Sequence, residues 1–312
     1  MNKNKIKRKS PILVVLGVIL ALYTLFIIIL FLWGFFSSLK SGAIVGPNIF
    51  RKNQLGLPQG LPWEWQWSNY VEIFDYLYVN AASPKIVNGV QTWPIVRIEV
   101  GEMLFNTLLY TFGGALVMTG VPCLTAYATA KTNFFFSKII DAVVLIAMVV
   151  PIVGSYPSQM QVLNTLHLYN TWPGYYIQIA HCISVYYLIF QAIFKSIPIT
   201  YSEAAYIEGA GEYRVLFQII LPLAMTTFFT VFLINFITIW NDYNTSMLYM
   251  PSTPSLAYAI YYVVFANGAR EISGNIPIRL AGAFILLTPI LILFICFRKV
   301  IMQNLSMGGL KE

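Results

Sequence analysis

Charge is scarce in this chain. Only 10% of its 312 residues are charged, whereas a soluble domain carries roughly a quarter. Hydrophobic residues make up 58% of the sequence, and the mean hydropathy is +0.70. The length would suit about two or three soluble domains, but the chain lacks the polar residues that their surfaces need. The composition therefore predicts a single unit embedded in lipid.

Reactive side chains are also scarce. Cysteine occurs three times, as isolated residues inside apolar runs, and histidine occurs twice. Neither residue type has the spacing of a zinc site, and two histidines leave little material for a catalytic triad. The sequence contains no phosphate-binding loop of the G-x-x-x-x-G-K-[ST] type, so this chain cannot hold and hydrolyse ATP itself. We therefore expect no enzyme activity and no cofactor or metal ion bound by this chain.

Positive charge is concentrated at the N-terminus. The formal net charge is +7, and five of the nineteen basic residues lie within residues 1–10. A basic cluster beside an apolar span is typical of a cytoplasmic terminus that lies against anionic lipid headgroups. The charge therefore indicates membrane topology, and we expect no nucleic-acid partner. The five residues are Lys3, Lys5, Lys7, Arg8 and Lys9.

Six apolar segments could cross a bilayer. A hydrocarbon core ~30 Å thick needs about 20 helical residues, since each adds about 1.5 Å. Each span should be helical, because lipid offers no partner to an unpaired backbone N–H or C=O. The predicted fold class is an all-α membrane protein with six transmembrane helices. The segments are 12–36, 104–124, 139–153, 173–194, 223–248 and 280–297.

These spans divide the chain into regions. An even number of spans places both termini in the cytoplasm, and twelve basic residues then lie inside against seven outside. The predicted regions are a cytoplasmic N-terminus (1–10), a first span (11–36), an extracytoplasmic loop (37–103), the main transmembrane domain (104–297) and a cytoplasmic tail (298–312).

A strongly patterned segment, 195–222, follows the fourth span. Thr200 followed three residues later by Glu203 fits a capping box, in which the threonine oxygen accepts a bond from a free N–H and the glutamate reaches back. A short helix should begin there. The two alanines after the glutamate give it a flat face that another protein can approach closely, and Gly209 with Gly211 permits the turn that ends it. We expect a short helix on the cytoplasmic surface, shaped for docking.

The same segment resembles the EAA loop of permease subunits of ATP-binding-cassette (ABC) importers. In that family the helix of the loop lies in a cleft of the ATPase subunit and transmits its movement to the pore. The resemblance implies a cytoplasmic coupling helix between the fourth and fifth spans, while a purely capping role for the glutamate is the alternative. The implied ATPase-coupling residues are Glu203, Ala204, Ala205, Gly209, Ile219, Leu221 and Pro222, the last well placed to open the next span.

The resemblance covers nearly the whole chain and is closest to the carbohydrate-uptake branch, in particular the maltose-permease G-type subunits. It is carried also by Ser-Ser-Leu-Lys at 37–40, Ala-Tyr-Ala-Thr-Ala-Lys at 126–131, Trp-Asn-Asp-Tyr at 240–243 and Gly-Gly-Leu-Lys at 308–311. It implies a pore-forming subunit for sugars or oligosaccharides in the cytoplasmic (inner) membrane of a bacterium. The implied partners are a second permease subunit in a heterodimer, two ATP-binding subunits that hold ATP and magnesium, an extracytoplasmic sugar-binding protein and membrane lipid.

The outer loop 37–103 is longer and richer in tryptophan than the resemblance predicts. Its run of Trp63, Trp65 and Trp67 favours an anchor at the membrane interface, where such rings are enriched. Contact with the binding protein or with sugar is the alternative interpretation.

Polar residues inside the spans are candidates for a substrate path. Asp242 is the acid of the fifth span's outer half, and an aromatic ring beside carboxylate and amide groups suits a sugar. A structural hydrogen-bond cluster that ties this helix to a neighbour, or marks its end, is equally consistent. Gln178, His181 and Ser184 lie at helical spacing in the fourth span, where interhelical bonding is the alternative to a water-filled path. The candidates are Asn235, Trp240, Asn241, Asp242, Tyr243, Asn244, Gln178 and His181.

Other functions remain open at this point. An importer for a non-sugar solute such as glycerol phosphate belongs to the same class, although the predicted spans contain no lysine or arginine to attract it. An ion-coupled secondary transporter would show inverted repeats and acidic relays, and neither is apparent. A membrane scaffold without transport activity is a third hypothesis.

Overall fold

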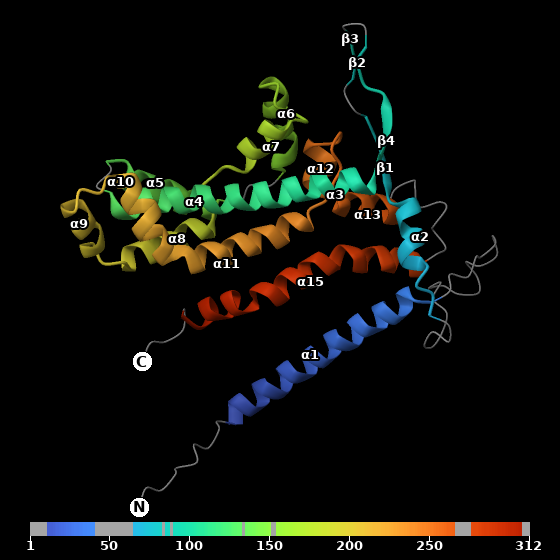
Figure 1. The fold of residues 1–312 in the computed structure, drawn as a ribbon, viewed down its shortest axis with the longest axis horizontal. Helices are drawn as coiled ribbons and strands as arrows, with labels where there is room; N and C mark the ends of the chain where they lie inside the picture. The colour runs from blue at the N-terminus through green and yellow to red at the C-terminus, as the bar shows by residue number, and fades with distance from the viewer. Residues whose placement is uncertain are drawn as a thin grey trace, which may run out of the picture. The chain divides into compact units, whose positions relative to one another are not determined.

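The computed structural model describes residues 11–40, 65–82, 85–87, 90–132, 135–150, 154–265 and 276–307 (Figure 1). The basic N-terminus 1–10, Trp63 and the segment 308–311 lie outside the described residues. Helices dominate, as predicted. The chain forms two compact units, of which the smaller comprises residues 1–76 and 263–285 and the larger comprises 77–262 and 286–312.

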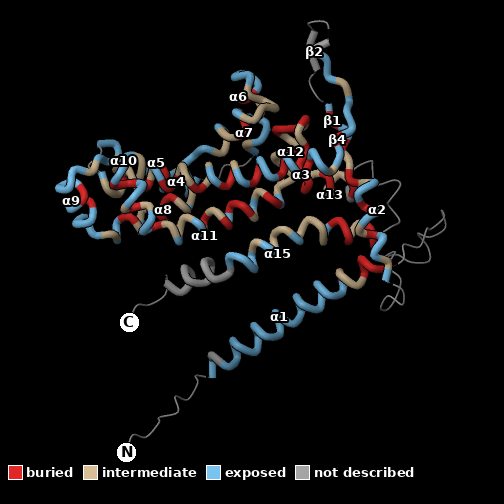
Figure 2. Tube along the Cα trace, viewed as in Figure 1, coloured by how far each residue is buried: buried red, intermediate tan, exposed pale blue. Residues whose placement is uncertain are grey.

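The first predicted span is helix α1 (Pro11–Ser38). Its 28 residues correspond to about 42 Å, which exceeds a hydrocarbon core of ~30 Å. Most of its side chains are exposed (Figure 2), as expected of a helix that lipid surrounds. Phe31 and Phe35 meet Phe284 of α15 (Ile276–Met307) edge-on, with ring centroids 5.3 and 5.7 Å apart.

The end of α1 is fixed by the start of α2 (Asn69–Tyr76). The buried Asn69 amide donates to the carbonyls of Ser38 and Lys40, at 2.8 and 2.9 Å. The hydroxyls of Ser38 and Tyr70 lie 2.8 Å apart, and burial raises the pKa of Tyr70 above its ordinary value. These bonds satisfy carbonyls that the end of a helix leaves without intrahelical partners.

Two short antiparallel strand pairs follow α2, so the all-α prediction is wrong for this part of the outer loop. Strand β1 (Tyr78–Ala82) pairs with β4 (Ile95–Glu99), and β2 (Lys85–Val87) pairs with β3 (Val90–Thr92). Burial alternates along β1, and its Val79 lies opposite Ile98 of β4, with each residue only 2% exposed. The β-branched residues of β4 favour a pleated, half-buried strand over a helix.

Two long helices form the centre of the larger unit. They confirm the predicted span 104–124 and the part of the predicted span 223–248 that ends at Trp240. One runs through α3 (Val100–Leu108), the π turn η2 (Leu109–Gly113) and α4 (Gly114–Lys131). The other runs through α10 (Glu212–Val215), the π turn η3 (Leu216–Ile220) and α11 (Leu221–Trp240). α4 and α11 lie side by side (Figure 1). With α8 (Val185–Ser196) they enclose a core that contains Tyr187, Phe190 and Phe194, none of them exposed.

The predicted count of six transmembrane helices is met only in part. Among the described residues, four helices are long and apolar enough to cross a membrane: Val14–Ser38, Val100–Lys131, Glu212–Trp240 and Ile276–Phe297. The predicted span 139–153 corresponds to α5 (Ser137–Val149), followed by a separate α6 (Ser155–Thr165). The predicted span 173–194 is divided between α7 (Trp172–Ile179) and α8.

The break between α7 and α8 contradicts the prediction of one continuous helix over 173–194. Each half is fixed to a different part of the unit. On α7, the Tyr175 and Tyr176 hydroxyls donate to the carbonyls of Tyr110 and Leu109 in η2, at 3.1 and 3.0 Å. On α8, the Tyr187 hydroxyl lies 2.7 Å from that of Thr129 on α4. Apolar periodicity cannot reveal such separate attachments, because both halves are apolar.

Further helices follow α11 in the chain. The short α12 (Asn244–Tyr249) and α13 (Leu256–Phe265) follow α11. Leu286 and Ile290 of α15 pack against a small cluster that includes Phe236 and Trp240. α15 itself begins four residues before the predicted span 280–297 and ends ten residues after it.

Gly174→Ala tests the attachment of α7. An added Cβ would lie 2.0 Å from the Leu168 carbonyl oxygen, so the backbone has to move, and overpacking of this kind costs about 1–3 kcal/mol. The matched control is Gly101→Ala in α3, where no atom lies within 4 Å of the new Cβ. We expect a lower melting temperature in detergent for Gly174→Ala and an unchanged or slightly higher one for Gly101→Ala. Equal melting temperatures for the two variants would contradict this packing.

Candidate functional site

The EAA-like segment contains a short helix, α9 (Thr200–Ile207), as predicted. The predicted capping box is wrong. Ile199 already has helical torsion angles, φ −65° and ψ −24°, and serves as the N-cap without a side-chain bond to the helix. Thr200 therefore lies inside the first turn, where its hydroxyl is not in the N-cap position that accepts from a free N–H. The start of the helix was predictable, but its capping was not.

The end of α9 confirms the turn predicted at Gly209. Gly209 has φ +85°, in the left-handed region that favours glycine. Its N–H donates to the Tyr206 carbonyl at 3.0 Å, and the Ala210 N–H donates to the Ala205 carbonyl at 2.9 Å. These two bonds form a Schellman motif, which satisfies the last carbonyls of the helix. Gly211 plays a different part, since it is extended (φ −78°, ψ 165°) and precedes α10.

The two alanines of the segment face opposite ways. Ala205 is only 6% exposed and packs into the core cluster that also contains Phe194 and Ala224, whereas Ala204 and Glu203 are exposed. The predicted flat docking face made by both alanines is therefore wrong, because the second one attaches the helix to its own protein. Glu203 and Ala204 remain on the outward face.

Ile219, Leu221 and Pro222 connect this loop to the next span. Ile219 and Leu221 pack against the same core cluster as Ala205. Pro222 lies in the first turn of α11, as predicted, but helical backbone already precedes it from Glu212 onward. Proline has no N–H and clashes with the carbonyl four residues back, and the wider π turn η3 accommodates both effects.

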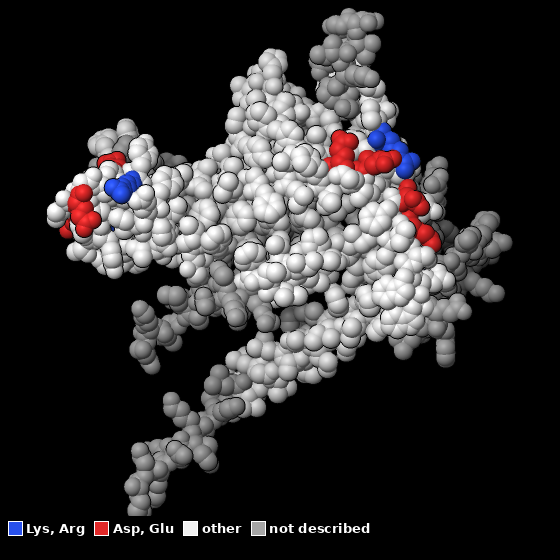
Figure 3. Space-filling model, viewed as in Figure 1, with Lys and Arg blue, Asp and Glu red and all other residues white. Residues whose placement is uncertain are grey.

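Exposed apolar side chains surround the outward face of α9, and sequence reasoning missed them. Ile207 is 88% exposed and Tyr213 is 83% exposed, and Tyr201 and Tyr206 are about half exposed. The acids Glu203, Glu208 and Glu212 lie among them, and Figure 3 shows red side chains gathered at this end. A clustered apolar and acidic surface of this kind is typical of a protein-binding site. The signal in the sequence was the tyrosine and isoleucine content of a segment predicted to lie on the cytoplasmic surface.

A partly buried polar network around Asp141 was also missed. Asp141 of α5 accepts hydrogen bonds from the Tyr187 hydroxyl and, at 2.5 Å, from the Gln191 amide. The Tyr187 hydroxyl also lies 2.7 Å from the Thr129 hydroxyl. The network therefore joins α4, α5 and α8. Asp141 was visible in the sequence as a lone acid in an apolar span, which is itself a signal of function or of interhelical bonding.

The candidate path residues do not gather around one opening. Asn235 is 1% exposed and donates to the Thr119 hydroxyl of α4 at 3.0 Å. The Trp240 indole N–H donates to the Leu286 carbonyl of α15 at 2.9 Å. Both side chains are thus engaged in contacts between helices, and a role in binding solute stays a prediction.

Asp242 marks the start of α12. One carboxylate oxygen accepts from the backbone N–H groups of Asn244 and Thr245, at 2.8 and 3.3 Å, and the other accepts from the Thr245 hydroxyl. Asn241 donates to the Ile237 carbonyl of its own helix, and Tyr243 stacks on the Tyr261 ring at 4.3 Å. The structural interpretation accounts for the observed bonds of Asp242, and contact with solute stays a prediction.

A small polar cavity adjoins Asp242. Its lining includes the side chains of Thr107, Tyr110, Tyr175 and Ser255, and its volume is about 10 Å³. That volume is close to the minimum for a single water molecule, so the cavity cannot hold a sugar in this conformation. Any solute site near Asp242 would require these helices to move apart.

Gln178 and His181 do not share a helical face, because the break after α7 separates them. Gln178 donates to Gln159 of α6 at 3.0 Å, and Gln159 accepts from the Tyr249 hydroxyl at 2.7 Å. His181 is exposed within the break. The side-chain oxygen Oε1 of Gln178 and the Ser184 hydroxyl are buried without a hydrogen-bond partner among the described residues. The prediction of helical spacing for these residues is therefore wrong.

Metal binding has no candidate in the described part of the chain. No group of three His, Cys, Asp or Glu residues there lies close enough to hold an ion.

Gly209→Ala tests the turn that ends α9. Alanine at a positive φ costs about 1 kcal/mol, so the turn should loosen and the loop should become easier to cleave. Gly211→Ala is the control, because an extended backbone with open space accepts a methyl group. Limited proteolysis of the purified chain measures both. Equal cleavage rates for the two variants would show that the left-handed turn is not formed.

Asp242→Ala and Asp242→Asn test the cap of α12. Loss of a capping side chain costs about 0.5–2 kcal/mol, whereas asparagine keeps an acceptor oxygen and should lose less. Asn241→Ala removes one exposed amide, and its free energy of unfolding should stay within about 0.5 kcal/mol of the wild-type value. Thermal unfolding in detergent gives the order of stability of these variants. Asparagine as harmful to stability as alanine would count against capping.

Comparison with known proteins places the chain in a family. Residues 118–306 match the family described as "Binding-protein-dependent transport system inner membrane component". The chain is 25% identical over 217 residues to the melibiose/raffinose/stachyose import permease protein MelC of Bacillus subtilis, which covers 69% of this chain and 78% of that protein. It is 23% identical over 294 residues to the diacetylchitobiose uptake system permease protein NgcG of Streptomyces coelicolor, which covers 93% and 86%.

A solved structure has the same fold. A chain of a bacterial ABC transporter involved in the import of the acidic polysaccharide alginate superposes with a TM-score of 0.69 at 22% identity, and the match covers 95% of this chain and 99% of that one. The family match spans more than half of the chain and includes α9, the residues that carried the resemblance. The chain is a multi-pass membrane protein and belongs to the family of binding-protein-dependent transport system inner membrane components.

Proposed function

We propose that this chain is a pore-forming permease subunit of an ATP-driven ABC importer that takes up sugars or oligosaccharides delivered by an extracytoplasmic solute-binding protein. Family membership supports the class of transporter. The names of relatives support the solute, since they include import permeases for melibiose, trehalose, diacetylchitobiose and maltodextrin.

The observation that carries the proposal is the two-sided packing of α9. One side, at Ala205, is locked into the core between α8 and α11, while the other presents Ile207 and Glu203 to the surroundings. A partner that grips the outward side would therefore move α8 and α11 together, because the packed core deforms little. This is the geometry that a coupling helix requires. The ATPase-coupling residues then form two groups. Glu203, Ala204 and Ile207 would contact the ATPase subunit. The residues that hold α9 in place would be Ala205, Gly209, Ile219, Leu221 and Pro222.

The proposal includes partners and an orientation. ATP and magnesium would be bound by two partner ATPase subunits, and a second permease subunit would complete the pore. The end that carries α9 would face the cytoplasm of a bacterium, with both termini on the same side. The strands β1 to β4 and the Trp65 and Trp67 rings belong to the predicted extracytoplasmic loop. They would contact the binding protein or the extracytoplasmic surface of the membrane.

A neutral solute fits the charge of the spans better than an anionic one. Within the four long spans of the described chain the cations are Lys131, Arg214 and Arg279, and each lies within four residues of an end. An anion such as glycerol phosphate would need cations deeper in the path. The polar candidates Asn235, Asn241, Tyr243, Asn244, Gln178 and His181 offer hydrogen bonds and rings suited to hydroxyl groups.

Glu203→Lys and Ile207→Asp test the coupling role. Each change disrupts the outward face of α9, where a docking residue contributes about 2 kcal/mol or more, so uptake should fall at least about ten-fold. ATP hydrolysis by the partner should continue. Uptake of melibiose, trehalose or maltodextrin and hydrolysis of ATP are both measured in proteoliposomes that contain the co-purifying subunits.

The control is Glu72→Lys on α2, which makes the same charge reversal at an exposed position of the smaller unit. It should leave both activities unchanged. Normal uptake by both α9 variants, or uptake by the wild type without ATP, would refute the proposal.

A further inference from the structure

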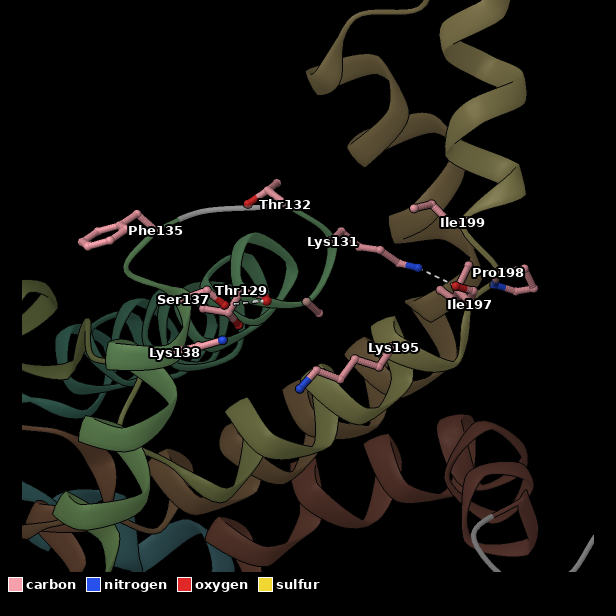
Figure 4. Close-up of a pocket in the computed structure, with 11 residues that line it drawn as sticks. Thr129, Lys131, Thr132, Phe135, Ser137, Lys138, Lys195, Ile197, Pro198 and Ile199 are labelled. Atoms are coloured by element: carbon pink, nitrogen blue, oxygen red, sulfur yellow. Dashed lines mark hydrogen bonds between the residues drawn. The ribbon is translucent and has the colours of Figure 1, made fainter.

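A basic cavity of about 770 Å³ lies beside the start of α9 (Figure 4). Its walls come from the end of α4, the start of α5 and the link from α8 to α9. Three lysines line it, Lys131, Lys138 and Lys195, and we call it the lysine cavity. No acidic residue is among the described residues that line it. The volume lies in the range of pockets that hold small molecules.

The three lysines differ in their bonding. Lys131 donates to the Ile197 carbonyl and so ties the end of α4 to the link before α9. Neither Lys138 nor Lys195 forms an ion pair or hydrogen bond with another described residue. In Figure 4 their ammonium ends are turned toward each other from α5 and α8. Like charges in one cavity repel, and an anion between them would remove that repulsion.

The hydroxyl groups of the cavity are already engaged as donors. Thr132 donates to the Ala128 carbonyl at 2.6 Å, and Ser137 donates to the Thr129 carbonyl at 2.8 Å. Asp141, one turn further along α5, accepts from Tyr187 and Gln191 and does not line the cavity. The free donors are therefore ammonium groups, which suit a phosphate or carboxylate.

The surroundings favour an amphiphilic anion. The helix Val100–Lys131, which is long and apolar enough to cross a membrane, ends at this cavity, and this would place the lysines near the membrane boundary. Phe135, which lines the cavity, is 82% exposed, and its neighbour Phe136 is 50% exposed. Exposed rings beside basic groups suit the region where acyl chains meet headgroups.

A protein partner suits this cavity less well. Glu203 on α9, Glu208 directly after it and Glu212 at the start of α10 lie in the adjoining segment and are exposed. A partner that complements those acids would itself be basic there, and a basic surface would be repelled by the lysines. The two neighbouring surfaces therefore call for two different occupants.

We propose that the lysine cavity binds the phosphate group of an anionic phospholipid, such as phosphatidylglycerol, next to the coupling helix. The placement of this end toward an anionic leaflet rests on the proposed function. Basic pockets between membrane helices are suited to such headgroups. A bound headgroup would bridge α5 and α8 just where the chain turns into α9, so lipid composition would influence how firmly the coupling helix is held.

Native mass spectrometry of the full chain, with the subunits that co-purify with it, tests the proposal. The complex is released from nanodiscs of phosphatidylcholine with and without phosphatidylglycerol, and the retained lipid is counted. Wild type should retain phosphatidylglycerol in preference to phosphatidylcholine. Lys138→Gln and Lys195→Gln should each weaken that retention about five-fold, which corresponds to ~1 kcal/mol per lysine near an anionic headgroup.

Two variants serve as controls. Arg214→Gln removes an exposed charge that lies outside the cavity, and it should retain phosphatidylglycerol as the wild type does. Lys195→Arg keeps the charge and should also retain it. Melting temperatures in pure phosphatidylcholine nanodiscs verify that all variants are folded. Equal retention by wild type and both glutamine variants, or an equal loss in Arg214→Gln, overturns the proposal.

Competition separates the sources of phosphate. Inorganic phosphate in excess should leave phosphatidylglycerol bound, and its displacement would assign the cavity to a free anion instead. A cross-link from Lys138 or Lys195 to a carboxylate of a co-purifying subunit, without retained lipid, would assign it to a protein partner. Lipid retention needs neither sugar nor ATP, so its loss is distinguishable from a failure of the transport function.

Discussion

Hydrocarbon offers no hydrogen-bond partner, so the backbone of this chain has to satisfy itself wherever it lies in the membrane. The long helices do so along their length. Hydroxyl side chains inside them donate hydrogen bonds to carbonyls one turn back, as those of Thr107 and Thr111 do at 2.7 and 2.6 Å. The departures from this rule occur where other parts of the protein supply bonds. The π turn η2 receives the hydroxyls of Tyr175 and Tyr176, and the link before α9 receives Lys131.

Specific polar contacts join neighbouring helices. In the larger unit Asn235 joins α11 to α4, Trp240 joins α11 to α15, and Asp141 joins α5 to α8. Apolar packing alone would let helices slide, since lipid tails are as apolar as the side chains. These bonds fix the register of neighbouring helices. A movement applied at one end of such a bundle is therefore carried along it rather than lost in local repacking.

In the proposed function, the loop that contains α9 applies that movement. Its inner side belongs to the core, and its outer side is apolar, acidic and uncovered. The lysine cavity adjoins it at residues 197–199, so an ATPase subunit and a lipid headgroup, if both bind as proposed, would act on the same short stretch of chain. The coupling helix would then respond to the energy source and to the composition of the leaflet in which it works.

The sequence alone determined the features that depend on local chemistry. Long apolar runs became α1 and the helices through α4, α11 and α15, because length and hydropathy suffice to define a span. Gly209 formed the left-handed turn, because glycine adopts it at little cost. The EAA-like spacing identified the family, because those residues form one contiguous segment.

Tertiary structure decided what depends on neighbours distant in sequence. The fourth apolar segment is broken because η2 holds one half and α4 the other, a division that periodicity does not record. Ala205 faces inward because α8 and α11 lie beneath it, and Asp141 is paired because Tyr187 reaches it from another helix. The sequence left a solute site and a structural hydrogen-bond cluster equally open for Asp242, and the turn of the chain brings its own following residues onto both oxygens. Residue type determines which bonds a side chain can make, and only the folded arrangement determines which partner lies within reach of it.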